Sequence, residues 1–240
     1  MSEAPRSSAL GDGPHGVLLG RTQELGVLTG ALVAGGSALI LGGKGMGKSA
    51  LLAAAHRAAI ARGLSTGLAA ASERSDITLA GLIDSLDAGG TVKAARVRAL
   101  QARLRRWCFE HPCAIFLDDG DRASGEVLRT VRRIVFETSA SVVVAARVGP
   151  ADPPDRLRRA AYPGSREIRL APLKPRFARA LARIHLGGDP KHENAIIRQS
   201  GGVPAAIVEM ARRHRDRQYS FQGQISWTLL IADLRMENRI

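Results

Sequence analysis

The sequence predicts an α/β fold: a three-layer sandwich with a parallel sheet between two layers of helices, followed by a small unit of helices alone. Three observations predict it. Short apolar segments of strand length alternate with helix-forming segments as far as Leu170, as in parallel strands joined by crossover helices. A glycine-rich stretch, Gly42 to Ser49, joins one strand to the next helix. From Pro172 onward, only helical patterns follow.

The glycine-rich stretch fits G-x-x-x-x-G-K-[ST] at every fixed position. An expected strand at Ser37–Leu41 precedes it and the helix-forming run Ala50–Ala55 follows, which is the context of a phosphate-binding loop (P-loop) rather than of a surface turn. Glycines allow backbone N–H groups to approach phosphate oxygens, and the helix directs its positive dipole end at the same anion. These features predict a P-loop NTPase fold, with the following nucleotide-binding residues: Gly43, Lys44, Gly45, Met46, Gly47, Lys48, Ser49 and Ala50.

Within this loop, two side chains have expected chemical roles. Lys48 would contact the β- and γ-phosphates, and the Ser49 hydroxyl would be a ligand of Mg²⁺. The cofactors implied are therefore ATP and Mg²⁺.

A second informative stretch, Cys113 to Asp119, reads as a buried strand that ends in two carboxylates. After a P-loop, such a strand is expected to supply Asp118 to the Mg²⁺ ion and Asp119 to orient or deprotonate the attacking water. Asp121 is a further candidate. The alternative is that these carboxylates cap the next helix.

The remaining elements follow from hydrophobic periodicity and from glycine or proline stops. Further strands are expected at Leu64–Ala71, Ser141–Ala146 and Arg166–Leu170. Helices are expected at Thr22–Val33, from the P-loop to Arg62, and at Asp76–Asp87, Val92–Phe109, Ser124–Thr138 and Asp155–Tyr162. The last unit holds helices at Lys174–Leu186, His192–Ser200 and Val203–Arg217.

These elements divide the chain near Ala171. We expect a disordered N-terminus at 1–16, a P-loop ATPase domain at 17–171, a helical lid at 172–218 and a C-terminal helical tail at 219–240. Arg147 follows the strand Ser141–Ala146. The carboxyl edge of a parallel sheet is where ligands bind, so Arg147 is expected to sense the γ-phosphate; a surface arginine is the alternative.

The 240-residue chain has 35 lysines and arginines against 22 aspartates and glutamates, a formal net charge of +13. This excess suits a polyanionic partner such as nucleic acid, although an arginine-rich genome-wide composition would produce it too. No apolar run approaches the ~18 residues of a spanning helix, so we expect a cytoplasmic protein without membrane contact. Cys108, His111 and Cys113 lack a fourth neighbouring ligand for zinc, and buried reduced thiols are expected instead.

The helix expected at Val92–Phe109 has an apolar stripe and a basic face. The candidate nucleic-acid contacts on this face are Lys93, Arg96, Arg98, Arg103, Arg105 and Arg106. We expect no carboxylate to offset these charges, so that an external anion would relieve their repulsion. A solvated basic face is the alternative.

In order and spacing, the motifs resemble the STAND and Orc/Cdc6-like branch of AAA+ ATPases, from about Leu18 to Arg217. The resemblance rests on Gly20-Arg21-x-x-Glu24-Leu25, Gly42 to Ser49, Leu117-Asp118-Asp119, Arg147 and Gly201-Gly202-Val203-Pro204. It implies that Leu19, Gly20 and Arg21 line an adenine pocket, that Pro204 closes over the base, and that Arg147 is the γ-phosphate sensor. It also implies an inter-subunit arginine finger among Arg156, Arg158 and Arg159, of which we select Arg159.

The resemblance leaves two classes of function in competition. One is a nucleotide-dependent switch that hydrolyses ATP slowly and controls homo-oligomer assembly or a protein partner; the other is a DNA-bound AAA+ regulator of replication initiation, helicase loading or transposition type. The Asp-Asp pair, in place of the Asp-Glu of vigorous AAA+ motors, indicates slow hydrolysis. A protein that binds nucleotide only as a structural element is a third class.

Overall fold

The computed structural model describes residues 18–86, 96–148, 157, 165–186 and 192–217. Several sequence-based predictions lie outside these residues: the N-terminus at 1–16, the tail at 219–240, the basic residue Lys93 and the finger candidate Arg159. The same holds for the helix expected at Asp155–Tyr162, apart from Leu157, which is helical and buried.

A five-stranded parallel sheet forms the centre of the molecule. Its strands are β1 (Ala38–Gly42), β2 (Ser65–Ala70), β3 (Cys113–Asp118), β4 (Ser141–Arg147) and β5 (Arg166–Arg169). Their order across the sheet is β2-β3-β4-β1-β5, and every neighbouring pair is parallel. Since the carboxyl ends of parallel strands lie at one edge, this order brings the ends of β1, β3 and β4 together.

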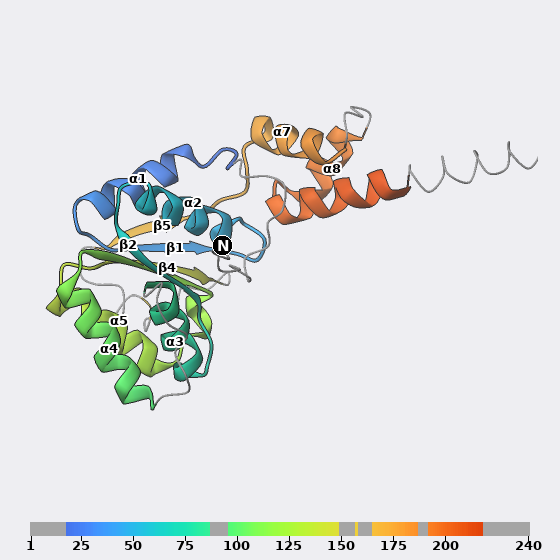
Figure 1. The fold of residues 1–240 in the computed structure, drawn as a ribbon. Coiled ribbons are helices and arrows are strands. Elements are labelled where there is room, and N and C mark those ends of the chain that lie inside the picture. Colours follow the sequence, from blue (N-terminus) through green and yellow to red (C-terminus); the bar gives the residue numbers. More distant parts are fainter. Residues whose placement is uncertain (1–17, 87–95, 149–156, 158–164, 187–191, 218–240) are drawn as a thin grey trace, which may run out of the picture.

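Helices cover both faces of the sheet, which confirms the predicted three-layer α/β sandwich (Figure 1). One face carries α1 (Thr22–Val33) and α2 (Lys48–Ile60). The other carries α3 (Ser75–Leu86), α4 (Val97–Glu110) and α5 (Gly125–Glu137), with the 3₁₀ helix η1 (Gly120–Arg122) after β3.

Alternating side chains of the strands fill the two layers of core. In β3, Ile115 and Leu117 pack with α3, α4 and α5, whereas Ala114 and Phe116 pack with α1 and α2. Because β1, β3 and most of β4 are buried on both faces, their sequences read as continuous apolar runs. Each buried aliphatic or aromatic side chain contributes roughly 1.5–3 kcal/mol to folding.

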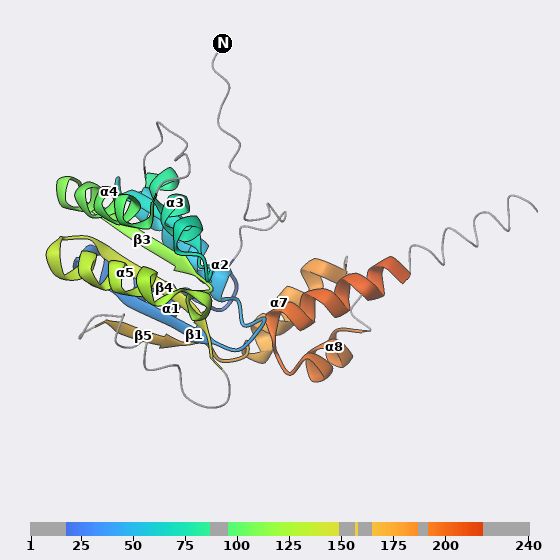
Figure 2. The same cartoon turned by 90° about the horizontal axis from the view of Figure 1, so that it is seen from below.

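Three helices follow the sheet and have a core of their own. They are α7 (Pro175–Leu186), α8 (Glu193–Ser200) and a helix at residues 204–217, and we call them the C-terminal helices. Their shared cluster consists of Leu173, Ala178, Ala182, Leu186, Ile196, Ile207 and Ala211. They lie beside one edge of the sheet (Figure 2).

Most predicted elements are observed with small shifts at their ends, and the predicted end of the strand Cys113–Asp119 was wrong by one residue. Asp119 is not part of a strand, because its backbone is left-handed (φ 49°, ψ 39°) and ends β3 one residue earlier. Ser124, expected to open a helix, is the N-cap of α5: its hydroxyl accepts a hydrogen bond from Val127 N at 3.2 Å.

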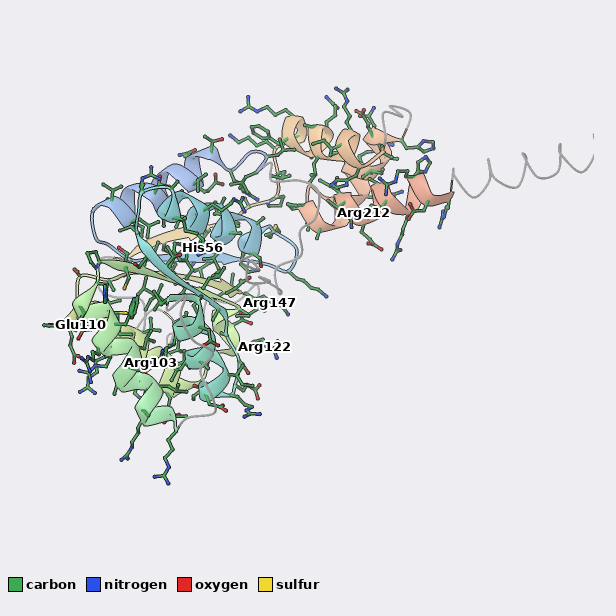
Figure 3. All side chains as sticks on the ribbon, in the orientation of Figure 1. His56, Arg103, Glu110, Arg122, Arg147 and Arg212 are labelled. Atoms are coloured by element: carbon green, nitrogen blue, oxygen red, sulfur yellow. The ribbon has the colours of Figure 1, made fainter. Side chains whose placement is uncertain are left out.

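His56 on α2 is half-buried against the sheet (Figure 3). Its Nε2 lies 2.9 Å from Thr66 Oγ1, and its ring meets the Phe116 ring edge-to-face at 5.2 Å. Burial lowers the pKa of His56 below its ordinary value of 6.5, and the nearby charge of Arg57 lowers it further. The folded protein therefore favours the neutral imidazole.

Between the lowered folded pKa and the ordinary unfolded value of 6.5, the unfolded chain binds more protons than the folded one. His56 therefore contributes stability above pH 6.5 that is lost as the pH falls through this interval. We expect the free energy of unfolding, measured by urea titration, to fall more between pH 7.5 and pH 5 for the wild type than for His56→Gln. Equal pH dependence of the two proteins would contradict this assignment.

Candidate functional site

The P-loop turns between β1 and α2 through glycines with left-handed backbones. Gly45 has φ +79° and Gly47, the N-cap of α2, has φ +86°. A Cβ on Gly45 would lie 2.8 Å from Ala205 Cβ, so both the conformation and the space exclude a side chain. The loop therefore presents bare backbone at the N-terminus of a 13-residue helix, where N–H groups lack helical partners and favour an anion.

The Lys48 side chain lies across this loop and is 8% exposed. Its Nζ donates to Gly42 O at 3.0 Å and to Gly43 O at 2.9 Å. Burial lowers the pKa of Lys48, and the positive charge of Arg147 lowers it further. Three carboxylates oppose this shift: Asp118, Asp121 and Asp119. The P-loop cation and the charged groups that end β3 and β4 thus lie within electrostatic range of one another.

The two carboxylates after β3 have different environments. Asp118 is 7% exposed, and its Oδ1 accepts the Asp119 N–H at 2.9 Å. Asp119 is half-buried and is the only non-glycine residue with positive φ in the described part of the chain. Gly120 packs so closely on β4 that a Cβ would meet Val144 Cγ1 at 2.4 Å. This tight turn holds Asp119 at the cavity described below.

Asp121 has a backbone contact that the sequence did not indicate. Its Oδ1 accepts the backbone N–H of Arg147 at 2.8 Å. Arg147 is paired with Gly42 in the sheet, and Val148 N donates to Gly42 O at 3.3 Å. Asp121 therefore joins the turn after β3 to the end of β4 beside the P-loop. Arg122 and Arg147 both lie at the sheet edge that faces the C-terminal helices (Figure 3).

Arg21 is 5% exposed and connects three segments. Its guanidinium donates to Glu24 Oε1 at 3.0 Å, to Met46 O at 3.4 Å and to Ala171 O. It lines the same cavity as the P-loop, but its donors are engaged with the start of α1, the P-loop and the segment after β5 that leads to the C-terminal helices. No sequence pattern near Arg21 indicates these distant backbone partners.

A cavity of about 520 Å³ lies at the P-loop, in the size range of about 300–1,000 Å³ typical of small-molecule and cofactor sites. Lining residues from the sheet side are Leu18, Leu19, Arg21, Lys44, Gly45, Met46, Gly47, Lys48, Ser49, Ala50, Asp119 and Arg147. The C-terminal side contributes Leu173, Leu181, Pro204, Ala205, Val208 and Glu209.

The structure thus brings Asp119, Arg147, Arg21, Pro204 and the predicted P-loop residues from Lys44 to Ala50 to one cavity. Two predicted residues, Gly43 and Gly20, do not line it. Asp118 does not line it and lies beneath Asp119 at the end of β3. Leu181 and Val208 also line the cavity, but the sequence did not predict this role for them. Helical periodicity cannot distinguish an apolar side chain at a cavity from one in a core.

A backbone contact joins the C-terminal helices to the P-loop, because Ala205 N donates to Gly45 O at 3.1 Å. On the C-terminal side itself, Leu173 N donates to Gly202 O at 2.8 Å. Gly20 approaches α7 so closely that a Cβ would meet the Phe177 ring at 2.5 Å. The two walls of the cavity are therefore in direct contact.

The described residues contain no group of three or more His, Cys, Asp and Glu side chains that could hold a metal ion by themselves. A Mg²⁺ ion with Ser49 and Asp118 as protein ligands would need the oxygens of a bound phosphate, as is usual for this ion. Cys108 and Cys113 are free thiols, both buried as expected. In the described ranges, no helix is long and apolar enough to cross a membrane.

The basic face of α4 differs from the prediction, which was wrong in expecting no carboxylate partners. Arg106 pairs with Glu110 at 2.8 Å, because α4 continues to Glu110 and places it one turn away. Arg105 pairs with Glu137 of the neighbouring helix α5. Arg103 and Glu110 lie on α4, on the opposite face of the sheet from His56 (Figure 3). Arg96, which precedes α4, and Arg98 are exposed.

The sequence matches no protein-family model and no curated protein. Among solved structures, the fold is similar to the ORC1 protein of Aeropyrum pernix in complex with DNA (TM-score 0.64, 19% identity, 90% of this chain and 68% of that chain). It is also similar to Cdc6p of Pyrobaculum aerophilum (TM-score 0.60, 15% identity, 90% and 65%). A third is the replication initiator DnaA bound to AMPPCP and single-stranded DNA (TM-score 0.52, 17% identity, 83% and 62%).

At these identities the similarity shows a shared fold. The chain spans about two thirds of the length of each of these structures.

The contacts of Arg21 yield a prediction about stability. A lysine at this position keeps the charge but cannot reach Glu24, Met46 and Ala171 together, and it leaves partly buried carbonyl groups without donors. We expect Arg21→Lys to lower the free energy of unfolding by roughly 1–3 kcal/mol in urea titrations. The exposed control Arg62→Lys should change it by less than about 0.5 kcal/mol; an equal effect of the two substitutions would refute the connecting role of Arg21.

Proposed function

We propose that this chain is an AAA+-type P-loop ATPase that binds ATP in the cavity at the P-loop and hydrolyses it slowly. The observation that carries the proposal is the convergence of bare P-loop backbone, a buried lysine, a carboxylate and an arginine at one cavity. The similarity to ORC1, Cdc6p and DnaA structures, one of them bound to the ATP analogue AMPPCP, supports the same family.

Each group at the cavity has a role in this proposal. The P-loop backbone and Lys48 would hold the phosphates, exchanging the carbonyl contacts of Lys48 for phosphate oxygens. Asp119 would order the attacking water, and Arg147 would sense the γ-phosphate. Such catalysis consists mainly of positioning and charge stabilisation. When bound, Mg²⁺ would neutralise phosphate charge, held by Ser49 and by Asp118 through its water shell.

The adenine base of ATP would lie between Leu19 and Arg21 on one side and Pro204 on the other. Because the cavity has walls from both the sheet and the C-terminal helices, we propose that residues 172–218 act as a lid. Bound ATP would stabilise the closed arrangement only to the extent that it binds this arrangement more tightly than an open one. The chain would then be a nucleotide-dependent switch of STAND or Orc/Cdc6 type, acting in the cytoplasm on a protein partner or on its own assembly.

The alternative is a DNA-bound AAA+ regulator of replication initiation, helicase loading or transposition type. The net charge of +13 favours it, and so does the DNA present in the ORC1 and DnaA structures. In this alternative Lys93, Arg96, Arg98, Arg103, Arg105 and Arg106 would be nucleic-acid contacts. ATP would assemble subunits along the DNA, with Arg159 as the finger that reaches the neighbouring nucleotide.

Two substitutions separate binding from chemistry. Lys48→Ala removes a charged donor to the phosphates, and we expect it to weaken ATP binding roughly 10- to 100-fold, as measured by calorimetry with Mg²⁺ present. Asp119→Asn keeps the size of the side chain but removes the base, and we expect turnover to fall about 10²-fold or more with little loss of affinity.

The exposed control Arg62→Ala should leave both quantities unchanged. Wild-type protein that binds ATP without turnover above that of Asp119→Asn would identify a nucleotide-binding protein that is not an ATPase. Absence of ATP binding by the wild type would overturn the proposed function.

A further inference from the structure

Arginine side chains line a second cavity, of about 690 Å³, between α4 and α5. Both helices lie on the face of the sheet opposite to α2 (Figure 1). Its lining residues are Arg98, Gln101, Ala102 and Arg105 from α4, and Glu126, Arg129, Thr130, Arg132, Arg133 and Phe136 from α5. We call it the α4–α5 groove. It shares no lining residue with the cavity at the P-loop.

The groove is built on packed helices. Gln101 Nε2 of α4 donates to Thr130 Oγ1 of α5 at 3.0 Å, and Thr130 Oγ1 donates to Glu126 O at 2.8 Å. Thr130 is 4% exposed. Beneath this bridge, Leu104 and Val131 belong to the core of the sheet. The guanidinium groups on both walls are therefore carried by a fixed backbone.

The charges of the groove are incompletely balanced. Five arginines line it against one carboxylate, Glu126, which also accepts a hydrogen bond from Ser75 at 2.9 Å. Arg105 and Arg133 share a second carboxylate, Glu137. Arg98 and Arg129 form no ion pair with any described residue, and Arg132 lies 5.5 Å above the Phe136 ring. Five permanent cations thus face two carboxylates, and guanidinium groups do not lose their proton near neutral pH.

We propose that the α4–α5 groove binds the phosphodiester backbone of a nucleic acid. Arg98 and Arg105 are two helical turns apart, about 10 Å along α4 at 1.5 Å per residue, while Arg129, Arg132 and Arg133 lie within about one turn of α5. The cations thus form two rows along the groove, and each guanidinium can hold a phosphate by two parallel hydrogen bonds.

The aromatic content of the groove favours nucleic acid over an acidic protein segment. Phe136 is 53% exposed and is the only aromatic side chain among the described residues that line the groove. A peptide would need several apolar pockets for anchor residues, whereas a base needs one aromatic face on which to stack. This inference deepens the DNA-bound alternative described above, and it depends on surface charge rather than on ATP hydrolysis.

The test compares two triple variants of the full chain that lose the same charge. Arg98→Ala, Arg129→Ala and Arg132→Ala remove groove cations, whereas Arg57→Ala, Arg62→Ala and Arg198→Ala remove exposed cations from α2, from the turn that follows it and from α8. Fluorescence anisotropy would measure the Kd for a labelled mixed-sequence 20-mer single strand and the matching duplex over a series of NaCl concentrations. Circular dichroism would check that all variants fold.

We expect the groove triple variant to raise Kd about 10- to 100-fold at 0.1 M NaCl and the control triple variant to raise it less than about 3-fold. The dependence of log K on log salt should become shallower by about 2 in the groove variant, because each lost phosphate contact removes about 0.7–0.9 from the slope. If the target is single-stranded, Phe136→Leu should weaken single-strand binding several-fold and leave duplex binding unchanged. If Phe136→Leu weakens the binding of neither probe, the target is assigned as duplex DNA.

Equal loss in the two triple variants, or no binding of either DNA by the wild type, would overturn the proposal. If poly-glutamate displaces the labelled DNA at the same concentration as unlabelled DNA does, the nucleic-acid proposal would be overturned in favour of an acidic protein partner. Lys48→Ala, assayed without nucleotide, should keep groove-dependent DNA binding. If the wild type shows such binding but no ATP turnover, the ATPase proposal fails and the groove proposal stands.

Discussion

The close approach of the P-loop backbone to the C-terminal helices is the contact on which the rest of the site depends. Gly45 takes a left-handed conformation with no room for a Cβ, and its carbonyl accepts the Ala205 N–H at 3.1 Å. A loop shaped to receive phosphate therefore also contacts the helix that carries Pro204. The cavity exists because these two walls meet at bare backbone, where a side chain would separate them.

Around this contact, several polar side chains hold backbone segments rather than ligands. Arg21 joins α1, the P-loop and Ala171, and Asp121 joins the turn after β3 to the end of β4. The bonds of Arg21 are charge-assisted and partly buried, so they are costly to break, since the partners are then left unsatisfied. The groups proposed to act on ATP thus lie at the sheet edge. Among the described residues, a backbone bond from Ala205 to Gly45 joins the proposed lid to the P-loop, which would suit the proposed nucleotide-dependent change of the lid.

The positive charge of the chain does not form one uninterrupted basic face on α4. On α4, Arg106 is paired within the helix and Arg105 with α5, and Arg98 and Arg105 line a groove between α4 and α5. The two cavities lie at different places on the same sheet, and no described residue lines both. Within the described part of the chain, occupancy of one cavity would therefore influence the other through the strands and helices between them.

The sequence alone determined the features that depend on neighbouring residues: the strand–loop–helix of the P-loop, the apolar strands buried on both faces, and the helices that follow the sheet. Only the tertiary structure decided the left-handed turn at Asp119, the partners of Arg21 and the pairing of Arg105 with Glu137. Arg105 and Glu137 lie on different helices, and Arg21 and Ala171 are separated by most of the folded chain. Periodicity reports which face of an element is apolar, but a contact between distant residues depends on how the elements pack, which no local pattern encodes.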